Sequence, residues 1–261
     1  MKVCILGKGL TSFALAKALI NLGIKVDVFI DNKIKLDDKS RTLGLSSSNI
    51  EFFNKNILNI ENLLWDIKKI EIFTENLKNE KILDFTNNDQ RLFSLIKNNE
   101  LFKKLNTALV KNKFFRIKKK INKNFFLQKD YNLIFNCDLN NSITKKFFYK
   151  KFSKDYQSFA FTGIIKHQKL KNDVATQIFT NKGPLAFLPI SENQTSVVFS
   201  VRGNGREDLK KSINQYNKKL KIKSLENINS FELKSSSLRT YYHKNILAFG
   251  DLLHKIHPLA G

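Results

Sequence analysis

The sequence predicts an α/β protein in which a parallel strand, helix, strand unit is joined to a second, mostly antiparallel β-sheet. Three observations carry this prediction. An apolar strand, a glycine turn, a helix and another strand follow one another over residues 2–31; four strand-like segments follow one another over residues 157–202; and an apolar segment returns at residues 241–249. A strand, helix, strand order is typical of parallel sheets, whereas strands in direct succession are usually antiparallel.

The N-terminal unit can be read from its apolar spacing. Residues 2–6 form a short buried strand, and Thr11 or Ser12 begins a helix whose apolar side recurs at helical spacing until Gly23 ends it. Residues 26–30 then form a second strand. We therefore expect a parallel strand pair with its connecting helix packed on one face.

The turn between the first strand and the helix has the composition of a phosphate-binding loop. Gly7 and Gly9 would let the backbone approach a pyrophosphate, which the positive helix N-terminus stabilises. Ser12 replaces the third glycine of the usual pattern, and Asp31, which follows the second strand, could accept hydrogen bonds from ribose hydroxyls. The candidate nucleotide-binding residues here are Gly7, Gly9, Leu10, Thr11, Ser12 and Asp31.

The remaining elements follow from periodicity and turn signals. We expect strands at 69–73 and 81–85 joined by a polar turn at 76–79, a helix at 91–109, a charged strand-like stretch at 114–127, and a buried strand at 132–137 that ends at Asp138. We then expect strands at 157–168, 173–180, 184–189 and 194–202, a basic helix at 207–220, and a strand at 241–249 that leads to Gly250 and Asp251.

Composition limits the classes of protein that the chain can represent. Its 261 residues are 42% hydrophobic, which is enough to bury a large core. No apolar run reaches the roughly 18 residues that a membrane-spanning helix needs, and the N-terminus has no signal-peptide pattern. We therefore expect a cytoplasmic protein, in which Cys4 and Cys137 are ordinary buried thiols.

The formal net charge of +23 raises the question of nucleic-acid binding. The excess comes almost entirely from lysines spread along the chain, which does not favour a nucleic-acid site. Lysines and phenylalanines do cluster over residues 113–126, and this cluster is either the solvated face of a hairpin or a contact for anionic lipid or an acidic partner. His254 and His257 have no further ligand at metal spacing, so we expect no metal site.

Three motifs together resemble one family. They are RTLGLSSS at residues 41–48, GPLAFLP at 183–189, and the segment from Arg239 that closes with GDLLHKIHPLAG at 250–261. In this order they resemble the class A FAD-dependent aromatic hydroxylases, and among these the ubiquinone-biosynthesis hydroxylases. The resemblance implies a Rossmann-like FAD-binding domain of the para-hydroxybenzoate hydroxylase type, interleaved with a sheet domain that binds substrate.

The resemblance also implies an activity. Such an enzyme is a monooxygenase that hydroxylates the aromatic ring of a polyprenyl phenol, using O2 and NAD(P)H through a flavin hydroperoxide. It would work in the cytoplasm, at the inner face of the membrane or in contact with a ubiquinone-biosynthesis complex. The cofactor would carry the chemistry, so no catalytic side chain is expected.

The family motifs imply roles for individual residues. Arg41 would bind the pyrophosphate with its planar guanidinium, and Asp251 would accept hydrogen bonds from the ribityl chain. Asp138 would also contact the flavin, and a tight loop from Pro258 to Gly261 would lie beside the flavin ring. The segment at 183–189 would face the substrate, although ordinary sheet core is an equally good interpretation of it. Its candidate pocket residues are Leu185, Phe187 and Pro189.

Two substitutions and the chain length depart from the family pattern. Leu139 stands where the family has a glycine and Lys145 where it has an arginine, and both changes weaken phosphate contact. Family members also continue beyond the closing glycine, which implies a C-terminally truncated chain. An alternative is therefore a non-catalytic FAD or nucleotide binder that acts as a partner in a biosynthetic complex.

The expected domains are discontinuous along the chain. The FAD-binding domain would comprise residues 1–67, 88–150 and 237–261, and the substrate domain residues 68–87 and 151–236.

Overall fold

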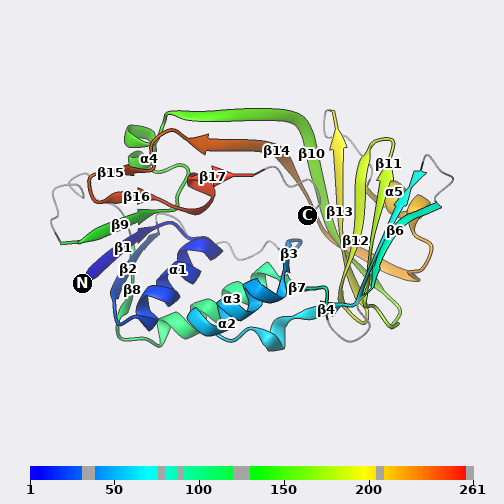
Figure 1. Cartoon of the computed structure of the whole chain (residues 1–261), viewed down its shortest axis with the longest axis horizontal. Coiled ribbons are helices and arrows are strands. Elements are labelled where there is room, and N and C mark those ends of the chain that lie inside the picture. Colours follow the sequence, from blue (N-terminus) through cyan, green and yellow to red (C-terminus); the bar gives the residue numbers. More distant parts are fainter. Residues whose placement is uncertain (31–38, 76–79, 87–90, 120–129, 204–208, 257–261) are drawn as a thin grey trace.

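The computed structural model describes residues 1–30, 39–75, 80–86, 91–119, 130–203 and 209–256. Two large sheets lie at opposite ends of an elongated molecule, and a small sheet and two helices lie along one side between them (Figure 1). This confirms the predicted mixture of parallel and antiparallel sheets. The division into two domains stays a prediction, because sheet membership alone does not define separately folding units.

The first large sheet is predominantly parallel. Its six strands lie in the order β15-β16-β9-β1-β2-β8, and only the β15-β16 pair is antiparallel. The strands are β1 (Lys2–Leu6), β2 (Lys25–Ile30), β8 (Phe115–Lys119), β9 (Leu133–Asn136), β15 (Tyr242–His243) and β16 (Ile246–Ala248).

Helices α1 (Leu10–Asn21) and α3 (Asn98–Val110) cover one face of this sheet. The apolar side of α1 is buried against β1 and β2, and the rings of Phe13 and Phe102 join the two helices at 4.5 Å between centroids. Gly23 ends α1 with a φ of +76°, a conformation that glycine adopts at little cost. Helix α4 (Ser142–Phe147) packs on the opposite face.

The second large sheet has eight strands in the order β17-β14-β10-β13-β12-β11-β5-β6. All its neighbours are antiparallel except β11 and β5. Helix α5 (Leu209–Tyr216) packs on one face of it. The strands are β5 (Lys69–Thr74), β6 (Glu80–Thr86), β10 (Lys151–His167), β11 (Val174–Thr180), β12 (Gly183–Ser191), β13 (Gln194–Arg202), β14 (Ile222–Leu238) and β17 (His254–Lys255).

Strands β10 and β14 form a long ribbon that joins the two ends of the molecule (Figure 1). Each has 17 residues, and their register shifts between Asp155 and Phe159, where Gln157 adopts a φ of +49°. The shift is a β-bulge, which bends a strand pair locally. The bend therefore lets one part of the ribbon pair within the large sheet while its other end extends to α4.

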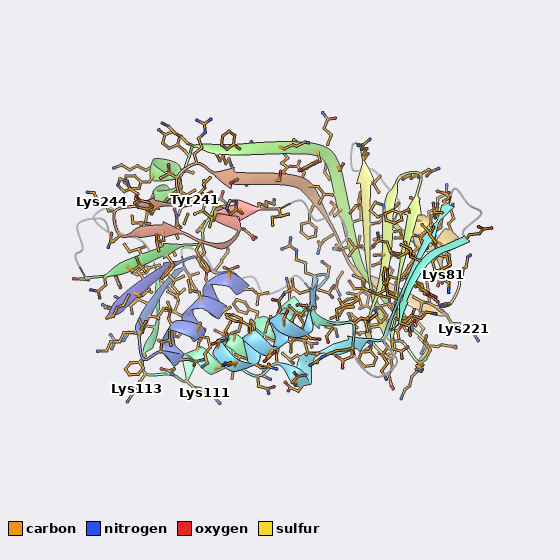
Figure 2. The ribbon with its side chains drawn as sticks, viewed as in Figure 1. Lys81, Lys111, Lys113, Lys221, Tyr241 and Lys244 are labelled. Atoms are coloured by element: carbon orange, nitrogen blue, oxygen red, sulfur yellow. The ribbon has the colours of Figure 1, made fainter. Side chains whose placement is uncertain are left out.

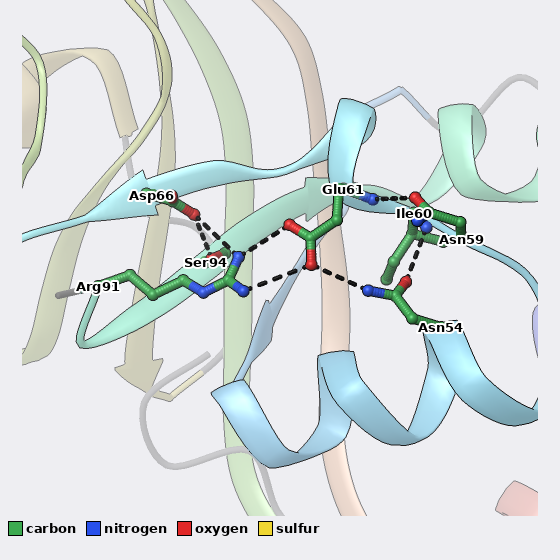
Figure 3. A network of polar contacts seen from close by, with 7 residues as sticks. All are labelled: Asn54, Asn59, Ile60, Glu61, Asp66, Arg91 and Ser94. Atoms are coloured by element: carbon green, nitrogen blue, oxygen red, sulfur yellow. Dashed lines mark hydrogen bonds and ion pairs between the residues drawn. The ribbon is translucent and has the colours of Figure 1, made fainter.

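A three-stranded antiparallel sheet, β3-β7-β4, lies between the large sheets. Its strands are β3 (Thr42–Leu45), β7 (Phe93–Lys97) and β4 (Trp65–Ile67), and α2 (Ser47–Asn56) follows β3. Arg91 ties this region together, since its guanidinium contacts Glu61 at 3.0 Å and Asp66 at 3.7 Å, and Glu61 also accepts from Asn54 (Figure 3). The hydrogen bond and charge of Arg91 lower the pKa of the Glu61 carboxyl.

Several predicted elements need correction. The expected helix at 91–109 begins only at Asn98, because residues 93–97 form β7 and pair with strands on both sides. The single strand at 241–249 is instead a hairpin of β15 and β16 with Lys244 and Asn245 at its turn. The described part of the lysine and phenylalanine cluster contains β8, which is a parallel neighbour of β2, and residues 120–126 of the cluster lie outside the described residues. The long strand β14 was not predicted.

Lysines lie at both ends of the molecule. Lys111 and Lys113 are at the end formed by the parallel sheet, Lys81 and Lys221 at the opposite end, and Lys244 on the β15-β16 turn (Figure 2). No helix of the described part is long and apolar enough to cross a membrane.

A buried acid stabilises the parallel sheet. Asp27 on β2 is 4% exposed; its Oδ2 accepts a hydrogen bond from the Tyr131 hydroxyl at 2.6 Å and lies 3.0 Å from Lys118 Nζ and 3.4 Å from Lys2 Nζ. Burial raises the pKa of this carboxyl, but the hydrogen bonds and the two ammonium charges outweigh burial and leave the pKa below its usual value. The charged carboxylate therefore favours the folded state.

We expect Asp27→Asn to lower the free energy of unfolding by about 1–2 kcal/mol at pH 7. Because the pKa is lower in the folded than in the unfolded chain, the unfolded chain binds the proton first as the pH falls. The wild-type advantage is thus complete above roughly pH 5 and shrinks below roughly pH 4. Urea unfolding of both proteins at pH 7 and pH 3 measures this difference in the free energy of unfolding. Glu51→Gln on the exposed side of α2 is the control, and an equal Asp27→Asn effect at both pH values would contradict this account.

Candidate nucleotide-binding site

Three loops meet at one edge of the parallel sheet. They follow β1, β9 and β16, which are adjacent parallel strands, so their carboxyl ends lie side by side. Backbone bonds fix the loops to the sheet: Cys137 N donates to Leu6 O at 2.8 Å, and Phe249 N donates to Asn136 O at 2.9 Å. Ligands of open α/β sheets bind at such an edge.

Gly7 makes the first loop possible. Its φ of +133° excludes most side chains, and a Cβ there would lie 2.9 Å from Ser12 Oγ and 3.2 Å from Cys137 Cβ. The backbone of the loop therefore lies directly against the start of α1 and the loop after β9. Ser12, at the place of the usual third glycine, is buried and fills the space beneath Gly7.

The N-terminus of α1 is open to a ligand. Gly9 is its N-cap, and the helix has no side-chain cap from the described residues and no acidic residue in its first turn. A Cβ at Gly9 would have no atom of the described chain within 4 Å. The N–H groups of the first helical turn have no partner within a helix, and they carry its positive dipole end. This arrangement suits an anionic group.

A buried amide network shapes the loop after β9. Asn136 Oδ1 accepts from Asn141 Nδ2 at 2.8 Å and from Asp138 N at 3.2 Å, while Asn136 Nδ2 donates to Thr144 Oγ1 at 2.8 Å. Thr144 Oγ1 in turn donates to Asp138 O at 2.5 Å. The network fixes Asp138 at the loop tip and leaves Leu139 exposed.

The loop after β16 closes on the same helix. Gly250 has a φ of +66°, and a Cβ there would lie 2.7 Å from Thr11 Cγ2. Asp251 follows it, exposed on a short 3-10 turn (Gly250–Leu252). Burial raises the pKa of the Cys137 thiol to about 11, and the negative charges of Asp138 and Asp251 add to the rise. The structure thus brings Gly7, Thr11, Ser12, Asp138 and Asp251 together.

A cavity of about 490 Å³ lies between the large sheet and the three-stranded sheet. Its walls combine apolar side chains with hydroxyl and amide groups, and Arg41 is the one charged residue among the described residues that line it. The Arg41 guanidinium stacks on the Phe231 ring at 4.4 Å. The structure therefore places Arg41 on the cavity wall, immediately before β3.

The architecture matches solved flavoproteins, while no family model matches the sequence. The structure of p-nitrophenol 4-monooxygenase PnpA from Pseudomonas putida superposes with a TM-score of 0.76 at 10% identity, over 98% of this chain and 74% of that one. PqsL from Pseudomonas aeruginosa is described as a probable FAD-dependent monooxygenase. It superposes with a TM-score of 0.74 at 13% identity, over 99% of this chain and 80% of that one. The chain shares the fold of these two monooxygenase structures.

A third match adds a structure with bound ligands. HpxO from Klebsiella pneumoniae, solved with FAD and uric acid, gives a TM-score of 0.72 at 14% identity, over 99% of this chain and 74% of that one. At these identities the similarity concerns the fold. It confirms the predicted fold class and leaves the roles of individual residues to their geometry.

Within this monooxygenase fold, the predicted pocket residues do not line the 490 Å³ cavity. Leu185 and Phe187 point to the other face of the large sheet, where they pack with α5. Phe187 and Pro189 instead line a smaller cavity on that face. The residues of β12 that reach the larger cavity are Ala186 and Leu188, one position out of phase.

Other predicted residues stand apart from the site or outside the described part. Asp31, Pro258 and Gly261 lie outside the described residues, as does His257. His254 Nδ1 is 2.9 Å from Ser237 Oγ on β14. Among the described residues no group of three or more His, Cys, Asp or Glu side chains could hold a metal.

Sequence reasoning missed two contributions to the site. The first is the amide network of Asn136, Asn141 and Thr144. Its only signal in the sequence is the spacing of Asn141 and Thr144, which is typical of a helix N-cap. The second is the contact of Thr11 with Gly250, which joins residues far apart along the chain and leaves no local signal.

Proposed function

We propose that this chain binds FAD at the three-loop site and is an FAD-dependent monooxygenase that hydroxylates an aromatic compound. The observation that carries the proposal is the convergence of the loops after β1, β9 and β16 on an uncapped helix N-terminus. The match to flavoprotein structures over nearly the whole chain supports it.

The residues present fit such a cofactor. The backbone at Gly7 and Gly9 and the first-turn N–H groups of α1, from Leu10 to Ser12, would hold the diphosphate. Asp251 and Asp138 would accept hydrogen bonds from sugar or ribityl hydroxyls. Bound there, FAD would supply the redox chemistry that activates O2, with NAD(P)H as the proposed electron donor.

The larger cavity supports an aromatic substrate of low charge. Its apolar walls include Phe93, Leu95, Leu188 and Phe231, and its polar groups are mainly hydroxyls and amides that can orient a phenol. The family resemblance extends the proposal to a polyprenyl phenol of ubiquinone biosynthesis, reached from a membrane surface or from a partner in a complex. In this proposal the chain excludes water and positions the ring, while Arg41 contributes the cavity's positive charge.

Two measurements test the proposal in order. FAD titrated into the purified chain should show saturable quenching of flavin fluorescence, and the loaded protein should then oxidise NAD(P)H faster when a phenolic substrate is present. Absence of flavin binding would overturn the proposal. Flavin binding without substrate-stimulated oxidation would instead favour the non-catalytic binder suggested by Leu139 and Lys145.

A cavity variant separates substrate binding from cofactor binding. Ala186→Phe adds a ring to the wall of the larger cavity, so it should raise KM or abolish turnover while leaving flavin affinity unchanged. Unchanged turnover in a folded, flavin-loaded Ala186→Phe protein would place the substrate elsewhere.

A further inference from the structure

The smaller cavity lies on the opposite face of the large sheet from the larger one. It has a volume of about 160 Å³ and is enclosed by the sheet on one side and by the end of α5 and the following turn on the other. The sheet residues that line it include Phe73, Thr176, Ile178, Phe187 and Pro189. The described residues that cover it are Gln215, Tyr216, Asn217, Lys218, Lys219 and Leu220.

Strand register explains why this floor is apolar. Thr176 pairs with Phe187 and Ile178 with Leu185, so the side chains of these four residues point to one face. The alternate residues, Ala186 among them, point to the larger cavity. Thr176 borders both cavities, and the other described residues that line them differ, so a ligand in one cavity leaves most of the lining of the other untouched.

The rim of the smaller cavity is positively charged. The charged residues among the described residues that line it are Lys171, Lys218 and Lys219, with no carboxylate. Lys219 Nζ is held 2.9 Å from the buried Glu71 carboxylate, and Lys171 Nζ lies 3.7 Å from Asp173. Lys218 makes no ion pair within the described part of the chain, and its ammonium lies 6.0 Å from the centre of the Phe73 ring. The Lys218 ammonium is thus available for an anionic ligand beside the apolar sheet residues of the cavity.

We propose that the smaller cavity is a second binding site, for a small amphipathic carboxylate. Its apolar part would occupy the space above Phe187 and Pro189, and its carboxylate would pair with Lys218. A dry cavity of about 150 Å³ is large enough for benzene, so the ligand carries about six apolar carbons. This site is independent of the proposed flavin site, because the two have no described residue in common.

Titration calorimetry on the full chain tests the proposal with hexanoate and benzoate as probes. We expect one saturable site with a Kd of about 1 mM or lower. Hexanol, which lacks the charge, should bind at least about fivefold more weakly. Trp65 gives a second readout, since it is the single tryptophan and its Nε1 donates at 2.7 Å to the carbonyl oxygen of Asn172, a residue that lines the cavity. Its fluorescence should change with the same Kd.

Matched variants locate the site. Lys218→Gln should weaken carboxylate binding about fivefold, whereas Lys221→Gln, which removes an exposed lysine near the cavity but not in its lining, should change the Kd by less than about twofold. Val174→Phe should abolish binding because it fills the cavity from the sheet side. Gln215→Trp narrows the cavity from the exposed side of α5 and should also weaken carboxylate binding. This variant serves as the test if Val174→Phe does not fold.

Three outcomes would overturn the proposal: no saturable binding of either carboxylate, equal affinity for hexanol, or an unchanged Kd in folded Val174→Phe or Gln215→Trp protein. Because flavin binding is measured separately, failure here would leave the proposed monooxygenase function untouched. Conversely, carboxylate binding to a chain that binds no flavin would support the second site alone.

Discussion

Gly9→Val should reduce the affinity for FAD at least about 100-fold, while the chain still folds. A Cβ added at Gly9 has no atom of the described residues within 4 Å, so a valine side chain meets no steric obstacle from them in the free protein. It would occupy the space through which the diphosphate approaches the first turn of α1. Replacing an N-cap glycine by valine costs only about 1 kcal/mol of folding free energy.

The measurement combines flavin fluorescence quenching with urea unfolding of the flavin-free protein. Gly9→Ser provides a graded control, because serine is a good N-cap and adds a smaller side chain. We expect the Gly9→Ser protein to be at least as stable as the wild type. Its flavin affinity should lie between those of the wild type and Gly9→Val. Wild-type flavin affinity in folded Gly9→Val protein would show that the cofactor binds elsewhere.

Gly183→Ala should destabilise the chain by about 3 kcal/mol or more, the largest stability effect that we expect from any single methyl group added here. Gly183 begins β12 with a φ of +141°, and a Cβ there would stand 2.0 Å from the carbonyl oxygen of Ser200 on β13. The obstacle is backbone of the neighbouring strand, which cannot move without breaking the β12-β13 pairing. The thermal midpoint should fall by about 6–12 °C.

Gly44→Ala is the matched control for this substitution. Gly44 also lies in a strand, but its φ is not positive and the nearest atom to an added Cβ is Phe93 Cδ2 at an ordinary 3.6 Å. We expect a change below about 1 kcal/mol. Similar midpoints for the two variants, measured by calorimetric scanning under one set of conditions, would contradict the steric argument.

The parts of the fold that the sequence predicted well are those with local causes. The strand, glycine turn, helix and strand of residues 2–30 follow from apolar spacing and from Gly7 and Gly23, whose backbone conformations are formed locally. The four strands between 157 and 202 alternate clearly enough to be read one by one. Gly250 and Asp251 were placed at the site by motif resemblance and not by any local pattern.

The errors arise where long-range contacts decide. Residues 93–97 continue the helical spacing of α3, but pairing with β3 and β4 holds them extended. Strand β14 is rich in serine, asparagine and lysine, and its pairing with β10 supplies the order that its own sequence lacks. On β12 both sets of alternate residues are apolar, so the sequence cannot tell which set faces which cavity, and the predicted pocket residues Phe187 and Pro189 line the smaller one.

The order of the three loops along the chain has a consequence for synthesis. The glycine turn after β1 leaves the ribosome first, but Gly250, which closes on Thr11, follows about 240 residues later. At typical elongation rates this interval is roughly 12–50 s. From the synthesis of β9 until that of its neighbour β16, about 110 residues later, one edge of β9 lacks its partner strand. The proposed FAD site is therefore complete only after β16 and Gly250 have been translated.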